Sequence, residues 1–247
     1  MSVLGIDIGG SGIKGAPVDL PTGTLTAERH RVETPRPADV PRVVAAVRQV
    51  VDLTGTADRI GVTFPGVVVG GVVRTAANLD QSWLQAPVAD LLGTAIGQPV
   101  TVINDADAAG IAEMAFGAGK GHRGVVVMLT FGTGIGSAVF LDGQLLPNTE
   151  LGHMEVRGRI AEARASGRAR EADDLDWQRW AQRLQEYLRR VEHLLQPDLM
   201  IIGGGISRKA DRYLPLIDVA TPVVPAALRN NAGIIGVAIA AGATPAG

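Results

Sequence analysis

Cysteine is absent from the 247 residues, which excludes disulfides, thiol nucleophiles and thiolate metal sites. No apolar run is long enough to span a bilayer, and no signal-peptide pattern precedes the first predicted strand. Charge is nearly balanced, with a net charge of −2, so a general nucleic-acid or membrane-surface binder is disfavoured. We therefore expect a cytoplasmic protein with no nucleic-acid or membrane partner. Any polyanionic ligand must meet a local basic patch.

Glycine, in contrast, is abundant, with 32 residues, nearly double the usual share of about 7%. The first glycine cluster joins two stretches that read as strands, residues 3–8 and 13–18. Glycine turns allow the backbone N–H groups to point at an anion. Asp7 stands at the mouth of this turn, where a carboxylate can hold the waters of a metal ion beside a phosphate. An ordinary β-hairpin is the alternative interpretation.

Two better-known glycine motifs do not fit the spacing. A dinucleotide fingerprint runs from a strand into a helix, and residues 13–17 are a poor helix start. A P-loop needs Ser or Thr after its Gly-Lys pair, but Gly119 and Lys120 are followed by Gly121.

Strands and helices then alternate along the chain. Asp39 can cap a helix with valines at helical spacing, and residues 59–64 read as a buried strand. A helix over 87–96 and a strand over 99–103 come next. This order predicts an α/β fold in which helices cover a largely parallel sheet.

Polar residues follow that last strand. Asn104 and Asp105 lead into a predicted helix over 106–116, at the end of a strand where α/β sheets place their ligands. A helix cap explains Asp105 equally well. A lone His such as His153 is more often packed or solvated than a ligand.

The pattern of strand, glycine turn and strand seen at residues 3–18 recurs later in the chain. A strand over 125–129, a glycine turn over 130–137 and a strand over 138–141 repeat it, and Gly203–Gly205 form a third glycine turn. Two such hairpins in separate halves predict a duplicated fold that binds phosphates from both sides of a cleft.

Together, the motifs at 5–14, 104–105, 130–136 and 150–153 resemble the ROK sugar kinases and repressors, which belong to the hexokinase–actin–Hsp70 superfamily. The resemblance implies an α/β protein of two ribonuclease-H-like domains around a central cleft. Residues 1–105 would form the first domain and residues 106–234 the second. A C-terminal helix over 235–247 would pack back on the first.

One departure from the family is informative. Typical members carry a cysteine-rich zinc loop after the Glu-x-Gly-His motif, and a sugar-binding Glu comes after the loop. Here Ala161–Ser166 looks like the segment on the far side of that loop, which implies that the loop is deleted, as in the actinobacterial polyphosphate-using branch. The resemblance thus implies no structural zinc and leaves His153 a sugar contact.

The resemblance implies phosphorylation of glucose at its 6-hydroxyl, giving glucose 6-phosphate, with inorganic polyphosphate and ATP as donors and Mg²⁺ held through Asp7. Asp105 matches the family's catalytic base. The expected sugar-binding residues are Gly66, Asn78, Asn104, Asp105, Glu150, His153 and Glu162. The expected donor-binding residues are Asp7, Gly9, Gly10, Ser11, Gly12, Lys14, Thr130, Gly132, Thr133, Gly134, Gly203, Gly204, Gly205, Arg208 and Lys209.

Other functions remain open. A strictly ATP-dependent ROK glucokinase, or a kinase for another hexose, is the main alternative. Repressors of the family carry an N-terminal helix-turn-helix domain, whereas here the phosphate strand starts at Val3. The family also implies a homodimer. A long polyphosphate would need a basic track, for which the candidates are Lys14, Lys120, Arg123, Arg208, Lys209 and Arg229.

Overall fold

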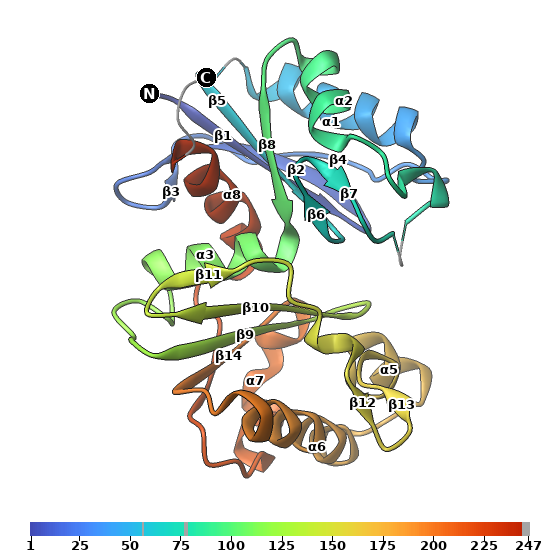
Figure 1. Ribbon diagram of the computed structural model, residues 1–247, viewed down its shortest axis with the longest axis vertical. Coiled ribbons are helices and arrows are strands. Elements are labelled where there is room, and N and C mark those ends of the chain that lie inside the picture. The colour runs from blue at the N-terminus through green and yellow to red at the C-terminus, as the bar shows by residue number, and fades with distance from the viewer. Residues whose placement is uncertain (56, 77–78, 244–247) are drawn as a thin grey trace. The chain divides into compact units, whose positions relative to one another are not determined.

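The computed structural model describes residues 1–55, 57–76 and 79–243. The chain divides into two units, which are described separately (Figure 1). Unit 1 comprises residues 1–112 and 231–247, and unit 2 comprises residues 113–230. The chain thus passes between the units twice, first inside helix α3 (Asp105–Phe116) and again just before helix α8 (Ala232–Ala243).

Unit 1 is built on a mixed sheet with the strand order β3-β2-β1-β5-β8 and β4 paired to β2. Its strands are β1 (Val3–Gly9), β2 (Gly12–Asp19), β3 (Thr24–Leu25), β4 (His30–Val32), β5 (Arg59–Phe64) and β8 (Val100–Asn104). Only the β1–β5 and β5–β8 pairs are parallel. The prediction of a largely parallel sheet is therefore wrong. The short β3 and β4 carry little strand signal of their own and extend the antiparallel hairpin.

Helices cover both faces of this sheet. Helix α1 (Val40–Thr54), capped by Asp39 as predicted, places Val50 where a Cβ at Gly15 would lie 2.5 Å away. Helix α8 lies on the other face and approaches the backbone of β1 and β5 closely. A Cβ at Gly5 would lie 2.1 Å from the carbonyl oxygen of Ile234, and one at Gly61 2.3 Å from that of Val237. Both strand positions therefore require glycine.

The smaller elements of unit 1 stand beside this sheet. Helix α2 (Val88–Ile96) packs against α1 and β8. The segment between β5 and α2 forms the β6–β7 hairpin (Val68–Val69, Val72–Val73) and a 3₁₀ turn (Gln81–Trp83). Trp83 of that turn is fully buried against Phe64.

Unit 2 repeats the sheet of unit 1, with the order β11-β10-β9-β14-β15. Its strands are β9 (Val125–Phe131), β10 (Ile135–Leu141), β11 (Gln144–Leu146), β14 (Leu199–Gly203) and β15 (Val223–Pro225). Here too a leading antiparallel hairpin is followed by two parallel pairs. The predicted duplication is confirmed by this correspondence.

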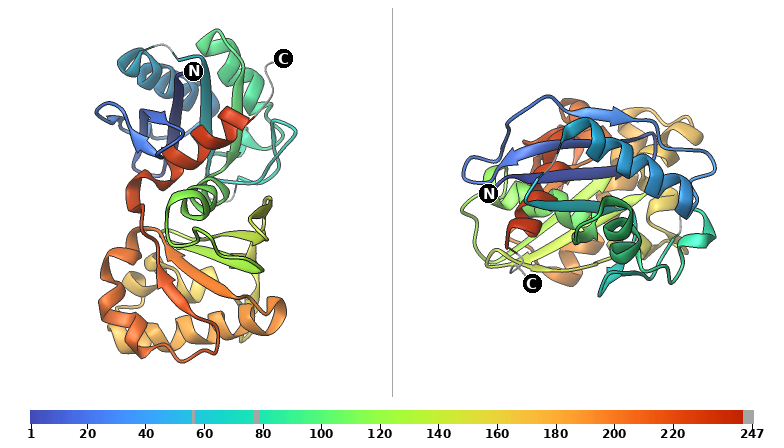
Figure 2. Two further views of the ribbon diagram at one scale, coloured as in Figure 1. Left: turned by 90° about the vertical axis from the view of Figure 1, so that its left-hand side faces the viewer. Right: turned by 90° about the horizontal axis from the view of Figure 1, so that it is seen from above.

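Helix α6 (Trp177–Leu195) covers one face of that sheet (Figure 2). It buries Trp180, Leu184 and Leu188 in the same core as the apolar side chains of the strands. The segment leading to α6, predicted as loop and short helix, forms several short elements. They are the β12–β13 hairpin (Glu155–Val156, Arg159–Ile160), α4 (Glu162–Ala165) and α5 (Gly167–Ala172). After β14 come the 3₁₀ turns Gly205–Lys209 and Leu214–Leu216, helix α7 (Ala210–Tyr213) and the 3₁₀ turn Arg229–Asn231.

Helix α8 begins at Ala232, three residues before the predicted start of the C-terminal helix. It is apolar on all sides, which is typical of a buried helix. Within residues 1–55, 57–76 and 79–243, no helix has both the length and the apolar character that crossing a membrane requires.

Candidate functional site

The first glycine turn joins β1 and β2 through the two residues Gly10 and Ser11, between the opposed Gly9 and Gly12. Two side chains from the following segment hold it in place. The Thr34 hydroxyl donates to the Gly9 carbonyl, and Arg31 Nη2 donates to the Ser11 carbonyl at 2.5 Å. Hydrogen bonds to two of its carbonyls therefore fix the backbone of this turn.

Asp7 occupies the same end of β1. Its Oδ1 accepts a hydrogen bond of 2.9 Å from the Thr63 hydroxyl, and its Oδ2 lies 3.9 Å from Lys14 Nζ. The start of α8 adjoins it, since a Cβ at Gly233 would lie 3.0 Å from Oδ1. A single, partly exposed carboxylate suits Mg²⁺, which keeps most of its waters and binds through one or two carboxylates and substrate phosphates.

Asn104 and Asp105 lie at the junction of β8 and α3. Asn104 Oδ1 accepts from the amides of Ala106 and Asp107 at 2.8 and 3.0 Å, so Asn104 is the cap of this helix. Its Nδ2 donates to the Gly66 carbonyl at 3.1 Å, which brings Gly66 to the same place. Because Asn104 caps the helix, a capping role is not needed to explain Asp105, although Asp105 Oδ1 also accepts a hydrogen bond from Ala106 N. Asn78 lies outside the described residues.

The second glycine turn, in unit 2, is tighter than predicted. Strand β9 continues to Phe131, so Thr130 lies within the strand, opposite Gly136, and the turn consists of Gly132, Thr133 and Gly134. Strand pairing extends to Phe131 and Ile135, so the first and last residues of the predicted turn belong to β9 and β10 instead. The Gly132 carbonyl accepts from Arg168 N at 3.0 Å, so the start of α5 buttresses the turn.

Three predicted sugar-binding side chains gather near this turn. Glu162 Oε2 accepts from the backbone amide of Ile135 at 3.3 Å. Glu150 Oε2 lies 3.6 Å from His153 Nδ1. Burial raises the pKa of the Glu150 carboxyl against the opposing effect of His153, and the Glu162 carboxylate adds to the rise. In this arrangement the carboxylates can accept hydrogen bonds from the hydroxyls of a polyol, and the imidazole can donate one to a hydroxyl oxygen.

Ser137 positions the segment that carries Glu150. Its buried hydroxyl donates to the Thr149 carbonyl at 2.7 Å and accepts from Leu151 N at 3.0 Å. Gly152 lies against β10, where a Cβ would come 2.1 Å from the Ile135 carbonyl. Glu150 is thus held from both sides along the chain.

The third glycine turn follows β14. Gly204 has φ of +77°, and a Cβ there would lie 2.5 Å from the Phe131 carbonyl oxygen, so this position also requires glycine. Ser207 closes the turn by donating to the Gly204 carbonyl at 2.8 Å. Arg208 and Lys209 are exposed on the 3₁₀ turn that follows, and the other predicted track residues of unit 2, Lys120, Arg123 and Arg229, are exposed too.

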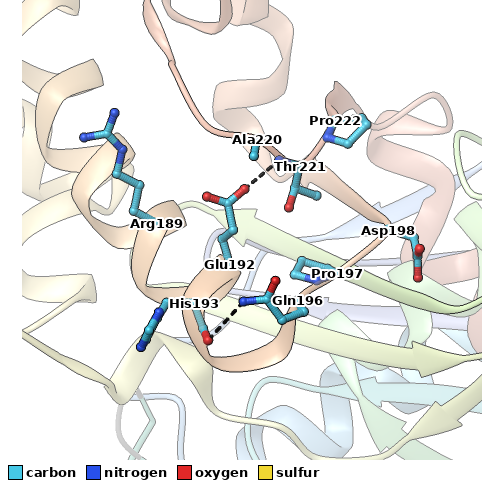
Figure 3. A pocket seen from close by; sticks show the side chains of 9 residues that line it. All are labelled: Arg189, Glu192, His193, Gln196, Pro197, Asp198, Ala220, Thr221 and Pro222. Carbon is cyan, nitrogen blue, oxygen red and sulfur yellow. Dashed lines mark hydrogen bonds between the residues drawn. The ribbon is translucent and has the colours of Figure 1, made fainter.

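Unit 2 also has a hollow of about 640 Å³ that none of the predicted site residues lines (Figure 3). It lies between the end of α6 and the segment before β15, where Glu192 accepts from the Thr221 amide. Arg189, on its edge, donates to the Asp218 carbonyl at 3.0 Å. The polar groups lining the hollow thus bond mainly within the protein.

Sequence reasoning missed Thr63, Ser137 and Arg31. Thr63 and Ser137 are polar residues in otherwise apolar buried strands, a signal that could have indicated them. Arg31 offers no such signal, because its role depends on the pairing of β4 with β2.

In the part of the chain that the structure describes, no group of three or more His, Asp or Glu side chains could hold a metal ion. The absence of structural zinc stays a prediction, which elemental analysis of tag-free protein would test.

The model of the ROK family matches residues 3–165 of this chain. A polyphosphate glucokinase of Mycobacterium tuberculosis is 54% identical over 237 residues, which cover 96% of this chain and 89% of that protein. Among solved structures, an inorganic polyphosphate/ATP-glucomannokinase from Arthrobacter sp. strain KM superposes with a TM-score of 0.95 at 52% identity, covering 98% of each chain. A ROK family glucokinase from Streptomyces griseus, in complex with glucose and AMPPNP, gives a TM-score of 0.83 at 25% identity, covering 99% of this chain and 100% of that one.

Proposed function

Because the chain belongs to the ROK family, we propose that it phosphorylates glucose at the 6-hydroxyl, with inorganic polyphosphate and ATP as donors. The observation that carries this proposal is the geometry of the β8–α3 junction. There Asn104 caps the helix, and Asp105 stands beside it at the end of a strand, where a catalytic base would stand.

In the proposed reaction, the 6-hydroxyl oxygen of glucose attacks the terminal phosphorus of the donor. An O–P bond forms to the sugar while the bond from that phosphorus to the bridging oxygen breaks. The electron pair of the broken bond stays on the shortened polyphosphate, or on ADP. The hydroxyl proton passes to the Asp105 carboxylate, because a sugar hydroxyl is a poor nucleophile until a base accepts its proton.

Phosphoryl transfer needs alignment and charge stabilisation more than covalent chemistry. In this proposal the backbone amides of the turns at Gly9–Gly12 and Gly132–Gly134 bind the donor phosphates, with Lys14 adding charge. Mg²⁺, when bound with the donor near Asp7, would neutralise phosphate charge. Thr63 holds the Asp7 carboxylate in orientation.

Sugar selection falls to the groups that pair with hydroxyls. Glu150, His153 and Glu162 in unit 2 are the proposed ligands, with Asn104 in unit 1 as a further one. A site built to hydrogen-bond each hydroxyl rejects a sugar that lacks one, because its own polar groups are then left unpaired. The name of the Arthrobacter protein makes mannose the first alternative sugar to test.

One coupled assay tests the proposal. Purified protein with glucose and Mg²⁺ is given long-chain polyphosphate, or ATP, and glucose 6-phosphate is measured through its dehydrogenase. We expect product with both donors. Product with ATP alone would leave the strictly ATP-dependent glucokinase, and product only with another hexose would reassign the substrate. Light scattering on the same sample would test the expected homodimer.

A further inference from the structure

A row of polar side chains crosses the sheet of unit 1 on the face that α8 covers. In the strand register Asp7 of β1 is opposed by Thr63 of β5 on one side and by Lys14 of β2 on the other. Lys14 in turn is opposed by Arg31 of β4. Side chains directly opposed in a ladder project to the same face, so these four follow one another in a line.

Arg31 lies directly over the first glycine turn. Its Nη2 donates to the Ser11 carbonyl, and a Cβ at Gly12 would lie 2.4 Å from its Nε. The absence of a side chain at Gly12 is therefore what allows the guanidinium to lie against the turn. The amides of that turn and this guanidinium belong to one surface.

The two cationic side chains of this row differ in whether a carboxylate lies near them. Lys14 has the Asp7 carboxylate at 3.9 Å, whereas no carboxylate pairs with Arg31 among the residues that the structure describes. Arg31 is exposed, and a guanidinium carries several N–H donors in a planar fork that matches phosphate oxygens. One donor is used on Ser11, so others remain for a ligand. Adjacent strands lie about 4.8 Å apart, so Arg31 stands one such step beyond Lys14.

We propose that Arg31 binds a phosphate unit of the donor beyond the one being transferred, and that it makes unit 1 a binding surface for inorganic polyphosphate. The inference rests on the proposed phosphoryl transfer. Polyphosphate carries a charge on every unit, whereas beyond its triphosphate ATP continues as an uncharged nucleoside. Contacts that follow the chain outward therefore favour polyphosphate over ATP.

The test compares Arg31→Gln with Arg31→Lys and with Arg48→Gln. Arg48 is a matched control, because it is a half-exposed arginine on α1, on the opposite face of the same sheet. For Arg31→Gln we expect KM for long-chain polyphosphate to rise about 10-fold, the scale of an exposed charge-assisted contact, with smaller changes for ATP and glucose. The slope of log KM against log salt should fall by roughly 0.7, the share of one neutralised phosphate on a single strand. Arg31→Lys should keep that slope, and Arg48→Gln should change neither quantity.

A binding measurement without turnover completes the test. Calorimetric titration of polyphosphate into each variant, with Mg²⁺ and without glucose, should show the same order of affinities. If Arg31→Gln raises KM for both donors equally and leaves the salt slope unchanged, Arg31 only braces the turn and the inference is wrong. If the unsubstituted protein makes no glucose 6-phosphate from either donor, the proposed function fails instead, whatever the titration gives.

Discussion

The buried carboxylate of Glu113 offers the sharpest stability prediction. Its Oε2 accepts from the amides of Ala118 and Ala227 at 2.8 and 3.0 Å, and its Oε1 accepts from Leu228 N at 2.7 Å. Glu113 is fully buried and follows the first passage of the chain between the units, while Leu228 shortly precedes the second. One side chain therefore fastens both chain segments inside unit 2.

Glu113→Ala removes the carboxylate, so these three amides lose their hydrogen-bond acceptor. An unsatisfied donor that is buried costs about 1–3 kcal/mol. Ala118 and Leu228 are half-buried and the exposed Ala227 can turn to water, so we expect a total loss of about 3 kcal/mol. For a unit of this size that corresponds to roughly 10 °C in Tm. Glu113→Gln keeps one carbonyl oxygen and should lose less.

Urea unfolding followed by tryptophan fluorescence measures this loss. In a Trp83→Phe background only Trp177 and Trp180 remain, and both report on unit 2. Glu192→Ala is the control, because Glu192 also accepts a backbone amide, that of Thr221, but does so near the surface. A Glu113→Ala protein within about 1 kcal/mol of its parent, or no worse than the control, would refute the reasoning.

Three further predictions concern the chemistry. Asp105→Asn should lower kcat by about 100-fold or more, the scale of a general base, while glucose binding measured by calorimetry persists; near-normal kcat would remove Asp105 from that role. Glu162→Ala should weaken apparent glucose affinity by about 1.5 kcal/mol, and Glu155→Ala, on the neighbouring hairpin, should not; the reverse pattern would mean that the wrong glutamate was chosen. Because burial raises the pKa of Glu150, KM for glucose should rise as the pH falls through a value above the usual one for glutamate, and Glu150→Gln should flatten that limb; an unchanged limb in the variant would assign it to another group.

The elements that could be predicted from sequence are those whose signal is local. Apolar runs ending in glycine indicated both hairpins, and the valine spacing after Asp39 indicated α1. The pairing of the sheet could not be predicted in the same way, because β4 has no periodicity of its own and acquires its position only by lying beside β2.

The candidate site divides along the same line. Asn104 and Asp105 follow a strand and precede a helix, so their position was visible in the chain. Arg31 owes its position to the register of β4 on β2, and Glu113 bonds to residues distant in sequence. Neither relationship can be read from the residues that flank them in the chain. The roles assigned to the sugar and donor ligands remain predictions.

The place of α8 has a consequence for the order in which the protein acquires its structure during synthesis. Domains usually fold from the N-terminus as the chain emerges. Here the sheet of unit 1 is made first, but the helix that covers the Gly5 and Gly61 face is translated only after the whole of unit 2. Unit 2 is continuous in sequence and is complete before that helix exists. Unit 2 can therefore fold before unit 1 is complete, and until α8 is made the sheet of unit 1 has one face uncovered. A chain that terminates before α8 would thus lose the cover of a sheet that was synthesised long before.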